Sequence, residues 1–238
     1  MESDIASTGQ FYSLLAWLDK NRKQIISTAV ILIIVGVVVS FVIWRNEQRR
    51  IQAGETLTSV FASSGSSGIV SAEALLKVAG DYSGTEAAGR ALLGGAGQLF
   101  LDGKISDAQA SFEKFVADYP DSSLLSQAKL GVAICLDAQG KTAEATTGFK
   151  EVVDRFPGGN TATPAKFYLA GLYEAQGKAE MARDLYLDLA RDNRSTYGSE
   201  SIGRLTEMFQ KNPSLRPGAA SPEVSAPPAS TTTNAASQ

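Results

Sequence analysis

Residues 103–120 read GKISDAQASFEKFVADYP, and residues 140–157 read GKTAEATTGFKEVVDRFP, so the same pattern returns after 37 residues. A Gly-Lys pair begins each stretch, and an aromatic residue followed by Pro ends it. A third Gly-Lys pair stands at residues 177–178, again 37 residues further on. Gly relieves a tight turn after a helix, and Pro stops the helix that follows. The pattern therefore predicts a turn, a helix and a stop in each unit.

Small and large residues keep the same spacing along these units. A small residue lets a neighbouring helix approach closely, and an aromatic ring fills the space between two helices. The matched positions are Ala96, Ala133 and Ala170; Leu99, Leu136 and Tyr173; Ala108, Ala145 and Ala182; and Phe112, Phe149 and Tyr186. Residues 86–198 are therefore predicted to form three stacked helix-turn-helix repeats.

A degenerate repeat is expected ahead of these three, in residues 45–85. Its first helix would be the polar, membrane-proximal stretch from Glu47 to Ala62, and its second helix would span about residues 70–81. The sequence SSGSSG at residues 63–68 is typical of a flexible connector between them.

A capping helix and a tail are expected after the repeats. Residues 199–211 carry Ile202, Leu205, Met208 and Phe209 at helical spacing, which favours a helix that covers the end of the stack. Residues 212–238 consist mostly of Pro, Ala, Ser and Thr. Such a segment has too little apolar surface to fold, so we expect a disordered tail.

Residues 25–44, IISTAVILIIVGVVVSFVIW, contain no charged side chain. At about 1.5 Å rise per residue, a helix of this length spans the roughly 30 Å hydrocarbon layer of a bilayer. The run is longer than the apolar core of a cleavable signal peptide, which favours an uncleaved transmembrane anchor. The alternative is a fully buried helix of a soluble domain.

The orientation of this segment is not fixed by charge. Lys20, Arg22 and Lys23 precede it, while Arg45, Arg49 and Arg50 follow it, so the positive-inside count is equal on both sides. Residues 1–24 are interpreted as a short tail with an amphipathic stretch. That stretch would either lie in the headgroup region or continue the spanning helix.

Composition excludes several classes of function. The chain has 22 Lys and Arg against 25 Asp and Glu, which gives no basic surplus for nucleic-acid binding. It has no His and one Cys, so zinc sites of Cys and His and catalytic triads with His cannot be built. The lone Cys135 is interpreted as a small buried residue. We expect no enzymatic activity, no cofactor, no metal and no small-molecule substrate.

The small residue, Gly turn, Ala, aromatic and Pro of each unit resemble the tetratricopeptide repeat, at 37 residues instead of about 34. The resemblance implies an all-α, right-handed helical solenoid behind a single N-terminal transmembrane helix. Tetratricopeptide domains bind other proteins, so the repeats are expected to act as a protein-binding module.

The front of the chain is similar to a narrower family. LAWLDKN at residues 15–21, the uncharged span, Trp44, Ala53 and Phe61 resemble the YfgM-like bacterial membrane proteins. That resemblance implies a single-pass protein of the bacterial inner membrane with its soluble domain in the periplasm. The implied partners are Sec translocon subunits and a membrane-anchored chaperone of the PpiD type. The alternative is a tethered scaffold or adaptor in outer-membrane or cell-wall assembly.

The first helices of the repeats are expected to line a concave face. Leu93, Leu130 and Phe167 occupy one repeat position, which indicates either an apolar groove for a partner segment or ordinary packing between neighbouring helices. The candidate partner-binding residues are Arg90, Leu93, Phe100, Leu130, Ile134, Asp137, Phe167 and Glu174.

Overall fold

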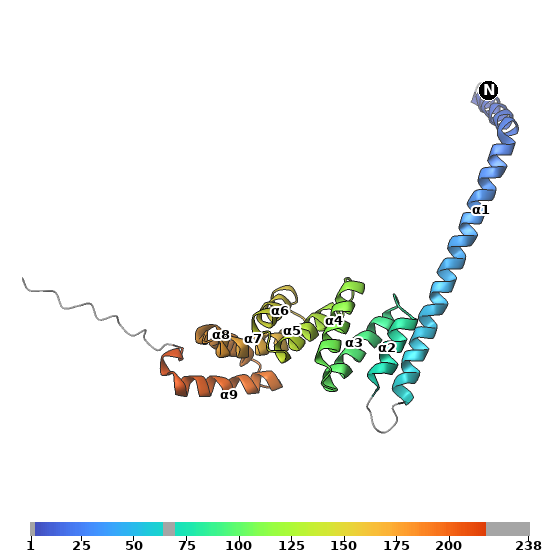
Figure 1. The fold of residues 1–238 in the computed structure, drawn as a ribbon. Helices are drawn as coiled ribbons and strands as arrows, with labels where there is room; N and C mark the ends of the chain where they lie inside the picture. The colour runs from blue at the N-terminus through green and yellow to red at the C-terminus, as the bar shows by residue number, and fades with distance from the viewer. Residues whose placement is uncertain (1–2, 64–69, 218–238) are drawn as a thin grey trace, which may run out of the picture. The chain divides into compact units, whose positions relative to one another are not determined.

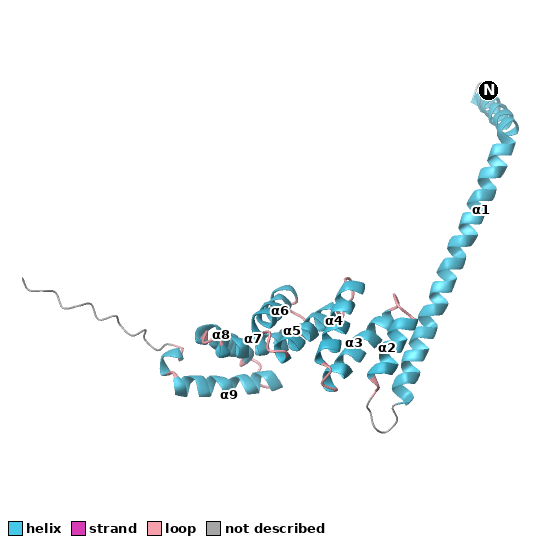
Figure 2. Ribbon diagram, viewed as in Figure 1, coloured by secondary structure: helices cyan, strands magenta, loops and turns pink. Residues whose placement is uncertain are grey.

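The computed structural model describes residues 3–63 and 70–217, with the side chains of 3–16, 18–19, 25 and 29 left undescribed. Within these ranges every regular element is a helix (Figures 1 and 2). The elements are α1 (Ser3–Ser63), α2 (Ala72–Asp81), α3 (Glu86–Leu101), α4 (Ile105–Asp118), α5 (Leu125–Ala138), α6 (Thr142–Arg155), α7 (Ala162–Ala175), α8 (Ala179–Leu189), α9 (Thr196–Lys211) and a 3-10 turn, Pro213–Leu215. The chain divides within α3 into two compact units, the first ending at Gly95 and the second beginning at Ala96.

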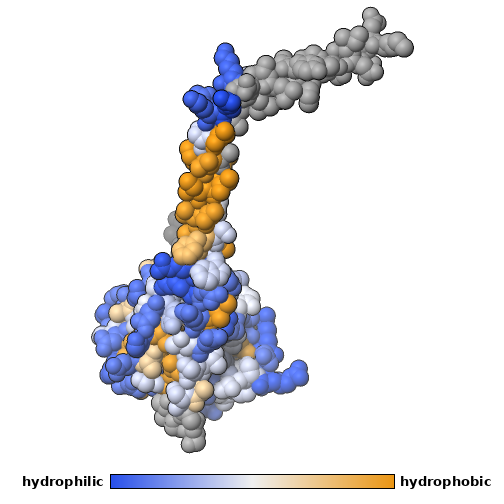
Figure 3. All heavy atoms as spheres, turned by 90° about the vertical axis from the view of Figure 1, so that its right-hand side faces the viewer, coloured by the Kyte–Doolittle hydropathy of each residue, from blue (hydrophilic) through white to orange (hydrophobic). Residues whose placement is uncertain are grey.

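The apolar segment lies inside α1, which runs without a break into the predicted polar helix. Its described side chains are exposed, including Ile33 at 65 % and Trp44 at 58 %. Figure 3 shows this segment as a hydrophobic band between hydrophilic ends. By length and composition it is the one helix in the described part of the chain that could cross a membrane.

The first unit packs the polar end of α1 against α2 and the start of α3. Leu57, Leu75, Val78 and Ala91 form its buried core. The Thr56 hydroxyl lies 3.1 Å from the Tyr82 hydroxyl, and the Arg49 guanidinium donates to the Asp81 carbonyl at 3.4 Å. These contacts join helices on both sides of the predicted connector, most of which lies outside the described residues.

In the second unit, each predicted Gly turn is present. Gly103, Gly140 and Gly177 have φ values of 76°, 73° and 73°, a left-handed conformation that Gly adopts without steric cost. The Lys141 amide donates to the Leu136 carbonyl and the Gly140 amide to the Asp137 carbonyl, at 2.9 and 2.8 Å. These two bonds form a Schellman motif, which satisfies carbonyls at the end of α5 before α6 begins. The other two turns repeat the same pair of bonds.

The small positions bring helices of one repeat together. Ala133 and Ala170 are fully buried. A Cβ placed on Gly148 of α6 would lie 3.0 Å from the Ala133 Cβ of α5. Phe149, Val152 and Tyr186 are part of the core that results. The predicted spacing of helices, turns and small residues in this part of the chain is therefore present in the structure.

The C-terminal end is longer than the sequence indicated. The Ser195 hydroxyl caps α9 by accepting from the Gly198 amide at 3.0 Å, and Leu205 and Met208 enter the core. Leu215, inside the segment predicted to be a disordered tail from residue 212, is 5 % exposed and belongs to the same core. The folded part therefore extends past the predicted boundary. The rest of the predicted tail, residues 218–238, lies outside the described residues.

Candidate functional site

The second unit contains an open hollow of about 620 Å³ beside α7, called here the α7 hollow. The end of α5 and parts of α8 and α9 complete its walls. Its lining residues are Asp137, Phe167, Tyr168, Gly171, Leu172, Glu174, Ala175, Tyr186 and Arg204. Three of the predicted site residues, Asp137, Phe167 and Glu174, are therefore brought together at one place.

Aromatic rings form one wall of the α7 hollow. The Phe167 ring centroid lies 5.9 Å from that of Tyr186 and 5.4 Å from that of Tyr197. Tyr168 stacks on the buried Phe149 at 5.4 Å and remains 36 % exposed. Such aromatic contacts stabilise the ring positions, so this wall is largely formed before any ligand arrives.

Two carboxylates face these phenols. Asp137 and Glu174 are 37 residues apart and hold the same position in consecutive repeats. Burial, with the Glu174 carboxylate beside the phenol, raises the pKa of Tyr186 to about 12. Burial and the neighbouring Tyr197 raise the pKa of Tyr168, and Asp137 adds to this effect. Both phenols therefore stay protonated at neutral pH, where they are able to donate hydrogen bonds.

Gly171 lines the α7 hollow and, having no side chain, leaves its space open. A Cβ built on this residue would meet a single atom group within 4 Å, the Tyr186 hydroxyl at 3.8 Å, which is an ordinary contact distance. A larger side chain at this position would extend into the hollow without displacing the backbone of a neighbouring helix.

The remaining predicted residues do not line the α7 hollow. Leu130 and Ile134 are half-buried and pack against the core of the second unit. Phe100 is half-buried near the end of α3, while Leu93 is half-buried in the first unit. Sequence reasoning missed Tyr168, Tyr186 and Arg204 as lining residues. One feature of the sequence could have pointed to Tyr168, because at the 37-residue offset this aromatic residue stands where the previous repeat has Gly131.

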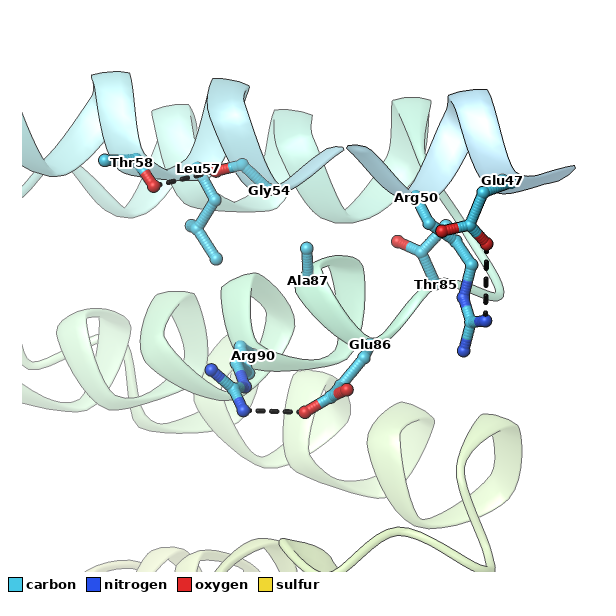
Figure 4. Close-up of a pocket in the computed structure, with 9 residues that line it drawn as sticks. All are labelled: Glu47, Arg50, Gly54, Leu57, Thr58, Thr85, Glu86, Ala87 and Arg90. Atoms are coloured by element: carbon cyan, nitrogen blue, oxygen red, sulfur yellow. Dashed lines mark hydrogen bonds and ion pairs between the residues drawn. The ribbon is translucent and has the colours of Figure 1, made fainter. Parts of the chain in front are cut away.

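Arg90 lines a different hollow, of about 330 Å³, in the first unit (Figure 4). The Arg90 guanidinium pairs with Glu86 at 2.6 Å, and Arg50 pairs with Glu47 at 3.9 Å. Leu57 and Ala87 contribute the apolar part of the lining. Each cation of this hollow thus has its own carboxylate within one helix turn, and the site offers a neutral, polar surface.

The structure also places the lone thiol and the side chains that could ligate a metal. Cys135 is fully buried, and burial followed by the nearby Glu113 raises its pKa to about 11, so the reactive thiolate is scarce at neutral pH. Among residues 3–63 and 70–217, no group of three or more His, Cys, Asp and Glu side chains is placed to hold a metal ion.

Comparison with solved structures shows a likeness of fold. A protein of Podosopora anserina, described as a kinesin light chain with nearly identical TPR-like repeats, is 16 % identical with a TM-score of 0.50. A single-substitution variant of that protein is also 16 % identical, with a TM-score of 0.51. Each match covers 71 % of this chain and 87 % of the other. No curated protein sequence matches the chain.

The sequence model of one family covers most of the chain. Its description is "Tetratricopeptide repeat-like domain", and it matches residues 16–195, from ahead of the apolar segment of α1 to the N-cap of α9. The fold, the Gly turns and the packing of the small residues agree with this match. The chain belongs to the tetratricopeptide repeat-like domain family.

Proposed function

We propose that this protein is a membrane-anchored protein-binding module, ancillary to the Sec translocon and the periplasmic chaperone network of a bacterium. Repeats of the tetratricopeptide type typically serve as non-catalytic interaction scaffolds, because stacked helix pairs expose an extended surface for partners. The observation that carries the proposal is the α7 hollow, a partly apolar recess formed by consecutive repeats.

The apolar segment of α1 supports the anchor. Fully burying a large aliphatic side chain gains about 1.5–3 kcal/mol, and this segment leaves a long series of such side chains exposed. A bilayer would cover them, while Trp44 and Arg45 at the end of the segment suit the membrane interface. The family match begins at residue 16 and therefore includes this segment.

Orientation and partners rest on the resemblance to YfgM-like proteins. We assign residues 45–238 to the periplasm and the anchor to the inner membrane. The proposed partners are Sec translocon subunits and a membrane-anchored chaperone of the PpiD type. In this assignment the domain sits at the outer mouth of the translocon and brings the chaperone to emerging chains. The binding surface is proposed to include Asp137, Phe167 and Glu174, with Leu130 and Ile134 beside them.

Affinity capture of the full chain from detergent-solubilised membranes tests this function. Recovery of translocon subunits together with a periplasmic chaperone is the expected result. The variant Gly171→Leu, which fills the α7 hollow, should lose the partners while remaining in the membrane, whereas the matched control Gly203→Leu, whose side chain enters open space, should retain them. Recovery of cell-wall or outer-membrane assembly factors instead would favour the scaffold alternative and contradict the translocon role.

A further inference from the structure

The half-buried carboxylates of the second unit are of two kinds. Lys129 pairs with Glu151 at 2.7 Å, and the equivalent residues of the next repeat, Lys166 and Asp188, pair at 2.6 Å. Asp137 and Glu174 are also half-buried. Among the residues that the structure describes, however, neither forms an ion pair with a Lys or Arg side chain. Both carboxylates line the α7 hollow.

A partly desolvated carboxylate without a counter-ion is a cost to the free protein, and a cation supplied by a ligand reduces that cost on binding. Glu174 has the phenol of Tyr186 beside it, and the negative charge of Asp137 contributes to the raised pKa of the Tyr168 phenol. Phenols are weaker partners for a carboxylate than a guanidinium or ammonium group. The hollow therefore has spare capacity for a positive charge.

The aromatic wall suits a planar cation. Tyr168 stacks one face on Phe149 and is 36 % exposed at the hollow, beside Phe167. A guanidinium group stacks over such rings and forms paired hydrogen bonds with a carboxylate, which an ammonium group does not reproduce. Arginine is thus the basic side chain that uses both the rings and the carboxylates.

The remaining lining and volume indicate what carries the arginine. Leu172, Ala175 and Phe167 are apolar, and about 620 Å³ is more than one guanidinium group fills. The chain's own residues 218–238 contain neither Lys nor Arg, so they cannot supply the charge. These properties fit a polypeptide segment of another protein in which apolar side chains flank an arginine.

We propose that the α7 hollow recognises an arginine flanked by apolar residues in a partner protein, with Asp137 and Glu174 opposing the guanidinium group. This inference rests on the proposed binding function and names the chemistry of the partner segment. Arg204 lines the same hollow but is ion-paired with Glu200 at 3.6 Å, so it limits rather than cancels the negative charge.

The test uses the full chain in detergent micelles and two heptapeptides with fluorescein on the N-terminal amine, fluoresceinyl-Ser-Leu-Phe-Arg-Ala-Leu-Ser-amide and the same peptide with citrulline in place of arginine. Citrulline has nearly the same shape without the charge. By fluorescence anisotropy, the arginine peptide should bind at least about fivefold more tightly than the citrulline peptide. The double variant Asp137→Asn, Glu174→Gln should remove this difference, and Arg204→Gln should enlarge it.

Two controls separate the hollow from general effects. Asp121→Asn with Glu180→Gln removes two exposed carboxylates outside the hollow and should leave the preference for arginine unchanged. Gly203→Leu on α9 matches Gly171→Leu in size, but its side chain would enter open space. Gly203→Leu should keep peptide binding, and Gly171→Leu should abolish it.

The outcomes distinguish this inference from the function on which it rests. Equal affinity for both peptides overturns the arginine assignment. The same holds if the arginine peptide does not bind at a protein concentration of about 1 mM, roughly the weakest interaction of interest. The broader binding function would still stand if Gly171→Leu abolished partner capture from membranes. Capture that Gly171→Leu leaves unchanged would remove the hollow from the function as well.

Discussion

Phe149 of α6 stacks on Tyr168 of α7 with ring centroids 5.4 Å apart, whereas its counterpart one repeat earlier, Phe112, packs directly over the backbone of Gly131. The two pairs occupy equivalent positions at the 37-residue offset. The aromatic residue of the second helix therefore keeps its place in both repeats, and it packs either against a glycine or against another ring of the following helix. In the later repeat that ring is Tyr168, which is the exposed ring of the α7 hollow.

Gly131→Ala tests this packing rule. An added Cβ would lie 2.7 Å from the Phe112 ring, so the ring must move, and the variant should lose about 1–3 kcal/mol of stability. Helix propensity alone would favour Ala by about 1 kcal/mol. In a Phe112→Ala background the clash is gone, and the same change should become neutral or stabilising. Guanidinium unfolding followed by circular dichroism measures both effects, and an equal loss in both backgrounds would contradict the rule.

The helical repeats follow from the sequence because their signals are local and periodic. Gly140 indicates a turn and Ala133 indicates a close contact between helices, and equivalent residues recur in the other repeats. The spacing alone therefore locates the helix pairs. The α7 hollow is different, since Arg204 and Tyr186 reach it only through the way α9 and α8 pack on α7. Leu215 shows the same limit, because its neighbours in sequence resemble a tail and only tertiary packing buries it.

Two truncations distinguish the folded end of the chain from the segment beyond it. Removing residues 212–238 deletes Leu215, which is 5 % exposed in the core, and should cost about 2–5 kcal/mol, the range for deleting a buried leucine side chain. Removing only residues 218–238 should leave the unfolding midpoint nearly unchanged, because few contacts are expected from that composition. Equal midpoints for the two truncated proteins would show that Leu215 contributes nothing to stability.

The buried Tyr186 phenol predicts a loss of stability at high pH. Its pKa is raised to about 12, above the value near 10 of an unfolded chain, so the folded state holds this proton more tightly. The stabilisation from this proton is fully present below the unfolded pKa near 10 and is lost as the pH rises through the folded pKa of about 12, because the unfolded chain ionises first. Stability should therefore fall as pH rises from about 10 towards 12, by roughly 1–3 kcal/mol.

Tyr186→Phe isolates this effect from the titration of lysines. The variant should lose less stability than the parent protein between pH 9 and pH 11.5, because it has no phenol to ionise. Denaturant unfolding at the two pH values gives the difference directly. A parallel decline in both proteins would mean that Tyr186 ionises in the folded state as easily as in the unfolded chain.

The proposed orientation is tested by limited trypsin digestion of spheroplasts that carry the full chain with an epitope at each terminus. Arg191 and Arg194 lie in the exposed connection between α8 and α9, where an unprotected domain should be cut first. With residues 45–238 outside the cytoplasm, the C-terminal epitope should be released while the N-terminal epitope stays in the membrane fraction. Because equal numbers of positive charges flank residues 25–44, the positive-inside count predicts neither orientation, and the digestion decides between them.

Lysed cells serve as the control for cleavage, and a cytoplasmic enzyme serves as the control for intact spheroplasts. Retention of the C-terminal epitope in spheroplasts, with its release only after lysis, would place the repeats in the cytoplasm and contradict the periplasmic function.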